Sequence, residues 1–159
     1  MSIDELDSRL IAALRDNPRV GLLEIARQLG VARGTVQARL AKLEGRGVIT
    51  GHGPEVDPSK MGYGISAFML VELAQGRLAE AVRSLEELPE VLEADAISGP
   101  QDLICRVVAH DTEHLQEIVN RLLANPAIRR CTSHIVLSRQ VPPRTGPLVS
   151  AAGSQGRAG

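Results

Sequence analysis

The stretch His110-Asp111-Thr112-Glu113-His114 has the residue types and spacing of a zinc site. Inverted zinc proteases carry the same HxxEH string, in which both histidines bind the metal from one face of a helix. Here Asp111 is suited to cap the following helix, which places His110 before that helix and not on it. No third ligand is evident in the sequence. We therefore expect a solvated strand-to-helix turn and no bound metal.

The other groups that could act as nucleophiles or bases do not form a catalytic set. Cys105 and Cys131 are isolated in apolar surroundings without CxxC spacing, as is typical of reduced core thiols. Neither combines with His52 or His134 into an evident nucleophile and base. The sequence therefore predicts a protein that is not an enzyme and has no cofactor. With no leader-like start and no apolar run of the ~20 residues that span a membrane, it also predicts a cytoplasmic protein without a membrane partner.

A basic segment, residues 33–46, offers a different chemistry. It carries four cations, Arg33, Arg39, Lys42 and Arg46, against the single anion Glu44. Such cations can neutralise the phosphates of a nucleic acid. The whole chain has 18 Lys and Arg against 19 Asp and Glu, so this signal is local and not a property of the whole protein.

The same segment has helical periodicity and a smooth outer side. Val36, Leu40 and Leu43 are spaced as one buried stripe, because successive helical residues are ~100° apart. Gly34 and Ala38 fall roughly opposite, so little side-chain bulk would keep this helix out of a groove.

The edges of this outer side are polar. Thr35 or Gln37 can reach base edges in a major groove while the cations meet phosphates. The alternative is an ordinary solvated helix with small outer side chains, and the segment alone does not decide between them. The residues assigned to DNA contact are Arg33, Gly34, Thr35, Gln37, Ala38, Arg39, Lys42 and Arg46.

Two further short helices are expected before the basic one. The first, over residues 6–14, begins with the capping-box spacing of Ser2 and Glu5. The second, over residues 22–29, ends at Gly30, a residue type common just after helices. Three short helices joined by tight turns are typical of a helix-turn-helix domain, whose last helix enters the major groove of DNA. This context favours the DNA-contact interpretation.

After the third helix the pattern changes twice. Val48 to Pro58, rich in glycine, predicts a short strand pair or wing that runs into a linker. Beyond Gly62, apolar runs and amphipathic stretches alternate in the order βαββαβ of a ferredoxin-like unit. The strands are expected at 65–73, 91–98, 103–109 and 131–137, and the helices at 77–88 and about 111–123.

The expected strands are apolar on both faces, as in LICRVVA at 103–109. Helices can cover only one face of such a sheet, so we expect the other face to pack against a second copy in a dimer. The stretch from Pro142 to Gly159 is rich in Pro, Gly, Ser and Ala with little charge, which predicts a flexible tail.

One loop of the second half could bind a small ligand. Gly99 would allow close approach to the backbone, and Asp102 could accept a hydrogen bond from an α-ammonium group. Gln101 could face the same pocket. In the simpler alternative, Gly99-Pro100 is a β-turn and the Asp102 side chain binds its own backbone surroundings.

Up to about Val141 the chain resembles the Lrp/AsnC (feast/famine) family of prokaryotic transcription regulators. The matching residues are Leu6-Asp7, Ile11, Leu14, Glu24-Ile25-Ala26, Gly30-Val31, Thr35-Val36, Arg39-Leu40, Leu43-Glu44, Gly47-Val48-Ile49, Asp57-Pro58 and Gly99-x-x-Asp102, with the closing strand 128–137. The chain departs from the family at Ala38 and Ala41, where many members carry Arg.

The resemblance implies an α+β protein with an N-terminal winged helix-turn-helix and a C-terminal ferredoxin-like βαββαβ (RAM) domain. The expected boundaries are a DNA-binding domain at 1–50, a wing strand and linker at 51–62, the RAM domain at 63–141 and a tail at 142–159. It also implies RAM-mediated homodimers, usually assembled into octamers. The partners would be double-stranded DNA and an amino-acid effector bound between dimers.

The resemblance further implies an effector contact on the closing strand. The family often carries two Thr at alternate positions there, which become Cys131 and Ser133 in this sequence. The assigned effector contacts are Gly99, Gln101, Asp102 and Ser133. Two other functions share parts of this pattern. An RNA-binding RRM would need aromatic residues on its sheet, where only Phe68 is available. An ACT-like amino-acid sensor would share the loop and the dimer without needing DNA.

Overall fold

The computed structural model describes residues 3–155 of the chain. Three helices form its first part. They are α1 (Glu5–Asp16), α2 (Leu22–Leu29) and α3 (Arg33–Gly45). The capping box of α1 is formed by Asp4 and Asp7 and not by the predicted pair, of which Ser2 lies outside the described residues. Gly30 ends α2 with φ 70°, a left-handed conformation that glycine adopts without the steric cost of a Cβ.

The apolar stripes of these helices meet in one core. Leu10, Ile25 and Leu43 are completely buried and Val36 is nearly so. Burying such a side chain contributes roughly 1.5–3 kcal/mol, and this burial fixes the side of α3 that faces inward. The predicted three-helix arrangement is confirmed.

The predicted wing is absent. Residues 48–57 form no strand, and the backbone N–H groups of Val48 and Ile49 instead donate to the carbonyl of Leu43. A short 3-10 helix, Pro58–Met61, follows, with Asp57 as its N-cap. An isolated two-stranded ribbon is marginally stable in water, and the glycines at 51 and 53 further disfavour it.

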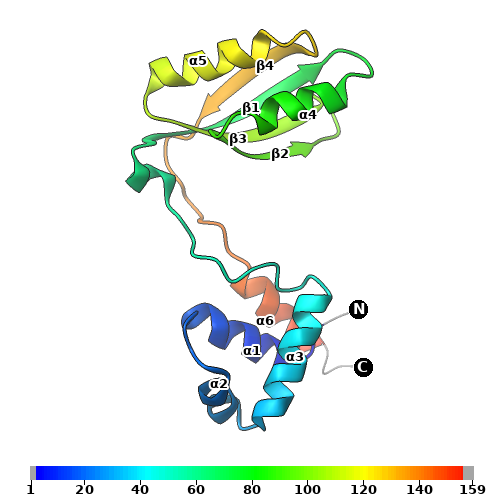
Figure 1. Cartoon of the computed structure of the whole chain (residues 1–159), viewed down its shortest axis with the longest axis vertical. Coiled ribbons are helices and arrows are strands. Elements are labelled where there is room, and N and C mark those ends of the chain that lie inside the picture. The colour runs from blue at the N-terminus through cyan, green and yellow to red at the C-terminus, as the bar shows by residue number, and fades with distance from the viewer. Residues whose placement is uncertain (1–2, 156–159) are drawn as a thin grey trace. The chain divides into compact units, whose positions relative to one another are not determined.

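The second half has the expected βαββαβ order. Its elements are β1 (Ile65–Leu73), α4 (Leu78–Glu86), β2 (Val91–Ala96), β3 (Leu103–Ala109), α5 (Thr112–Leu123) and β4 (Ile128–Ile135). All neighbouring strands are antiparallel, in the order β2-β3-β1-β4. Both helices cover the same face of the sheet, as Figure 1 shows. The ferredoxin-like prediction is confirmed.

The two faces of this sheet differ in burial. On the helix-covered face Ala67, Met69 and Val71 of β1 are completely buried. On the other face, here called the open face, Phe68 is 41% exposed. Residues that pair across strands share a face, so Arg106 and His134, the partners of Phe68, lie on the open face too. No helix of this half covers it.

The predicted flexible tail is wrong for residues 146–155, which form helix α6 (Gly146–Gln155). This helix packs against α1, beside which it lies in Figure 1. Its Gly, Ala and Ser content resembles that of disordered segments, but small side chains also allow two helix backbones to approach closely. Residues 156–159 lie outside the described part of the chain.

The described residues therefore form two units. The first unit contains the residues up to Pro54 and those from Val141 onward, and the second unit contains Glu55–Gln140. None of the described helices is both long enough and apolar enough to cross a membrane.

Candidate nucleic-acid and effector sites

Helix α3 turns one polar, small-residue side to solvent. Its apolar side is held by Val36 and Leu43, which are buried in the core of the first unit. We call the exposed side the docking face. It consists of Arg33, Gly34, Thr35, Gln37, Ala38, Ala41, Lys42 and Arg46, all exposed.

The docking face presents polar and cationic side chains beside a part without side-chain bulk. Gly34 has no atom within 4 Å of the position that a Cβ would take, so this part of the face is open. Thr35 and Gln37 place hydrogen-bond donors and acceptors on this face. Lys42 and Arg46 form no ion pair within residues 3–155.

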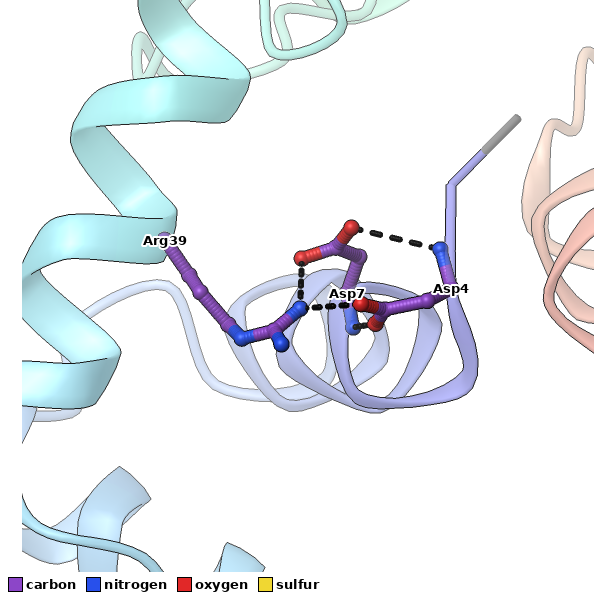
Figure 2. A network of polar contacts seen from close by, with 3 residues as sticks. All are labelled: Asp4, Asp7 and Arg39. Atoms are coloured by element: carbon purple, nitrogen blue, oxygen red, sulfur yellow. Dashed lines mark hydrogen bonds and ion pairs between the residues drawn. The ribbon is translucent and has the colours of Figure 1, made fainter. Parts of the chain in front are cut away.

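Arg39 has a different environment from the other cations of α3. Its Nη1 donates to Oδ1 of Asp7 at 2.8 Å and also to Oδ2 of Asp4, and both acids belong to the start of α1. Figure 2 shows the guanidinium reaching from α3 to these two carboxylates. The sequence predicts Arg39 as a DNA contact, but in the structure its charge is paired with Asp4 and Asp7 inside the first unit. The side chain is only 29% exposed.

The two acids and Arg39 stabilise one another electrostatically. The Asp7 side chain is 4% exposed, and a buried carboxylate needs a cation and hydrogen bonds to compensate for lost hydration. The hydrogen bond from Arg39 lowers the pKa of Asp4, and the bonds to Asp4 and Asp7 raise the pKa of Arg39. Because this network joins α1 to α3, it adds to the packing of Val36 and Leu43 in holding the helix that carries the docking face.

The sequence pattern missed Asp4 and Asp7 as partners of Arg39. Their three-residue spacing is that of a capping box, and both do serve it, since each side chain accepts from the other's backbone N–H. The spacing contained no sign that both carboxylates also face a residue more than 30 positions away.

The predicted ligand loop connects β2 to β3. Gly99 has φ 134°, a conformation that strains any side-chain-bearing residue. Oδ2 of Asp102 accepts from the backbone N–H of Leu73 at 2.7 Å, and the Asp102 N–H donates to the carbonyl of Val71. The side chain therefore binds the neighbouring backbone, as the simpler sequence interpretation held.

That bond uses only part of the Asp102 carboxylate. The residue is exposed, and its Oδ1 accepts no hydrogen bond from the described residues. A carboxylate anchored by one oxygen can present the other to an ammonium group. Gln101, the preceding residue of the loop, is half-buried.

Ser133 is not part of this loop. It lies on β4 and pairs with Met69, whereas the loop contacts β1 from the β3 side. Cys131, two residues earlier, pairs with Val71 and so shares the Ser133 face. Burial raises the pKa of the Cys131 thiol to about 11, and the same cause raises that of Cys105 to about 11. Both thiols are therefore neutral near pH 7.

The HxxEH stretch adopts the predicted turn. Asp111 caps α5 by accepting from the His114 N–H, and His110 precedes the cap. The two imidazole rings stack with centroids 4.9 Å apart, and His110 Nδ1 contacts the carbonyl oxygen of Gly62. Within residues 3–155, no three His, Cys, Asp or Glu side chains are grouped so that they could hold a metal ion.

Comparison with known proteins gives two family matches. Residues 3–44 match the AsnC-type helix-turn-helix domain, and residues 66–145 match the Lrp/AsnC ligand binding domain. Regulatory protein AsnC of Escherichia coli K12 is 31% identical over 141 residues, which cover 87% of this chain and 93% of that protein. The HTH-type transcriptional regulator FL11 of Pyrococcus horikoshii is 29% identical, covering 85% and 89% respectively.

Solved structures agree with these matches. The structure of Escherichia coli AsnC superposes with a TM-score of 0.85 at 30% identity and covers 92% of this chain and all of that one. A feast or famine regulatory protein from Mycobacterium tuberculosis, complexed with L-methionine, has a TM-score of 0.78 at 27% identity. Its match covers 89% of this chain and 96% of that chain.

Proposed function

The chain belongs to the Lrp/AsnC family of transcriptional regulators, and we propose that it binds specific DNA sequences through α3 under the control of an amino acid. The observation that carries the proposal is the docking face, which is exposed and combines small side chains with cations, while the opposite side of α3 is buried. A helix with these properties can enter a major groove without steric obstruction.

The residues of the docking face have separate roles in this proposal. Gln37 and Thr35 read base edges, and Arg33, Lys42 and Arg46 neutralise phosphates. Arg39 is a positioning residue that holds α3 through Asp4 and Asp7. Because the phosphate contacts of one docking face are few, two faces acting together would be needed for tight binding.

A second copy of the chain can supply the second docking face. The open face of the sheet exposes Phe68 and no helix of the second unit covers it, which supports a dimer through this surface. Such a dimer would set two recognition helices about one DNA turn, ~34 Å, or a multiple of it apart. Assembly of four dimers into an octamer is part of the same proposal.

The proposed effector is an α-amino acid at the β2–β3 loop. Oδ1 of Asp102 would accept from the ligand's ammonium group, with Gly99 and Gln101 beside it. The Mycobacterium tuberculosis relative solved with L-methionine supports this ligand class. Ser133 would contribute only if the ligand also reached β4 or a neighbouring subunit. Ligand binding can change DNA affinity only if the ligand binds two arrangements of the dimers with different affinities, and that difference limits the size of the change.

Genomic capture tests the proposal directly. Sheared genomic DNA of the source organism would be incubated with the full chain, and the retained fragments sequenced with and without a mixture of the amino acids. Enrichment of fragments that share one sequence, changed by the mixture, is the expected result. Uniform retention of all fragments would contradict sequence-specific binding.

A further inference from the structure

Helix α6 is fitted closely to α1. Gly153 is buried, and a Cβ added to it would lie 2.5 Å from the Ser8 Cβ, closer than real side chains approach. The Ser8 Oγ donates to the carbonyl oxygen of Val149 at 3.1 Å. At the other end, the buried Gly146 lies against the guanidinium of Arg15, the end of a long side chain that is 53% exposed and can move aside, so the rigid contact is the one at Gly153. Gly146 and Gly153 are seven positions apart, as are Ser8 and Arg15, so the two antiparallel contacts lie two helical turns apart.

The two family matches do not account for this helix. They end at residues 44 and 145, and α6 begins at Gly146. Its outer side includes Leu148, which is 71% exposed, whereas the two buried residues of 146–154 are Gly146 and Gly153. The glycines, which have no side chain, allow the two backbones to approach closely.

The position of α6 relates it to the docking face. A Cβ on Gly153 would also lie 3.4 Å from the backbone oxygen of Asp4. Asp4 caps α1 and binds Arg39 of α3, so α6 lies against the residue that positions the recognition helix. The chain from 136 to 145 joins α6 directly to β4, the last strand of the second unit. The two units are therefore connected by two segments of the chain.

We propose that α6 belongs to the DNA-binding unit and supports its affinity for DNA. Seated on α1, it holds Asp4 and thereby the Arg39 contact that helps to orient α3. This inference rests on the proposed function, because its readout is DNA affinity.

The substitution Gly153→Ala tests the seating of α6. Ala favours helix more than Gly does, so an undocked α6 would leave the melting temperature unchanged or raise it. A docked α6 would instead be forced away from Ser8. We expect the melting temperature to fall by about 4–8 °C, as one unfavourable contact gives in a unit this small. DNA affinity should fall severalfold, with the salt slope unchanged because no phosphate contact is removed. The matched control is Leu148→Ala, on the exposed side of the same helix.

Combining Gly153→Ala with Ser8→Gly gives a second, sharper test. Ser8→Gly removes the Cβ that an alanine at 153 would meet, so Gly153→Ala should have little additional effect in the Ser8→Gly background. All four proteins, the wild type, both single variants and the double variant, would be measured as a double-mutant cycle for melting temperature and DNA affinity.

The outcomes separate the two proposals. Coupling between positions 8 and 153 in both readouts supports the inference. Lower melting temperature with unchanged DNA affinity would show that α6 only stabilises α1, and equal behaviour of Gly153→Ala and Leu148→Ala would show that α6 is not seated there. Either result overturns the inference while leaving the proposed function intact. If the wild type bound no duplex selectively, the proposed function would fail, and the inference with it.

Discussion

The guanidinium of Arg39 lies 2.8 Å from a carboxylate oxygen of Asp7, and this pair joins the recognition helix to the first helix. Asp7 is buried at the start of α1, whereas Arg39 lies in the middle of α3. A cation that the sequence presents as one of four on a DNA-binding helix is therefore already paired inside the protein. Within residues 3–155, the other cations of α3, Arg33 and Lys42, form no ion pair.

Arg39→Met should destabilise the first unit. It leaves the buried Asp7 carboxylate without its cation, and breaking such a pair costs about 3 kcal/mol of unfolding free energy. Because the chain has no Trp, urea unfolding should be followed by circular dichroism. Lys42→Ala, at an exposed position of the same helix, should change the unfolding free energy by less than about 0.5 kcal/mol. Equal stability of the two variants would show that the network contributes nothing.

Lys42→Ala and Gln37→Ala should affect DNA binding differently. Loss of a phosphate contact weakens binding to all duplexes alike and lowers the slope of log affinity against log salt by about 1 per site. Loss of a base contact changes which duplex is preferred and leaves that slope nearly unchanged. Anisotropy titrations of each variant on several duplexes measure both quantities. A similar change of sequence preference in both variants would refute this division of roles.

The acid side of the stability profile should depend on Asp4. Its pKa is lower in the folded protein than in the unfolded chain, chiefly through the Arg39 hydrogen bond. The unfolded carboxyl therefore takes up a proton first, so this stability is present above about pH 4 and is lost as the pH falls toward the folded-state pKa. Asp4→Asn should remove this contribution to the pH dependence of the unfolding free energy, and Arg39→Met should reduce it.

Two substitutions at Asp102 should separate folding from ligand binding. Asp102→Asn keeps an oxygen that can accept from the Leu73 N–H but loses the charge that an ammonium ligand needs. Asp102→Ala loses both, at a cost of about 1 kcal/mol for the missing hydrogen bond. We expect Asp102→Asn to melt near the wild-type temperature yet to lose the response of DNA binding to added amino acids. A full response in this variant would remove Asp102 from the ligand site.

Neither cysteine should react readily in the native protein. Burial raises the pKa of Cys105 and of Cys131 to about 11, so little thiolate forms at pH 8. Treatment with a disulfide reagent should label both thiols rapidly after denaturation and slowly before it. Fast native labelling of Cys131 would indicate that β4 is far more accessible than its half-buried position implies.

Local patterns were sufficient to predict most of the fold. The stripe Val36, Leu40 and Leu43 determines which side of α3 is buried, and that choice follows from helical periodicity alone. The order βαββαβ follows in the same way from alternating strand and helix patterns. These features depend on the spacing of residues that are close in sequence, so the sequence alone contains the information needed to predict them.

The features that were missed depend on contacts between distant residues. Arg39 and Asp7 are 32 positions apart, and Gly153 meets Ser8 across most of the chain. Glycine and alanine in residues 146–155 have the composition of a flexible tail, and only the packing against α1 shows their use. The hydrogen bond from the Leu73 N–H to Asp102 likewise joins the end of β1 to the β2–β3 loop, 29 positions away, so residue spacing did not predict it.

The most direct test of sequence-specific DNA binding is fluorescence anisotropy of the full chain with the duplex upstream of its own gene. A scrambled duplex of the same composition is the control, and each titration is repeated at several salt concentrations with and without the twenty amino acids. We predict selective, salt-steep binding to the upstream duplex that the amino acids shift. Equal weak binding to both duplexes in every condition would contradict this account and favour an ACT-like sensor that does not act on DNA.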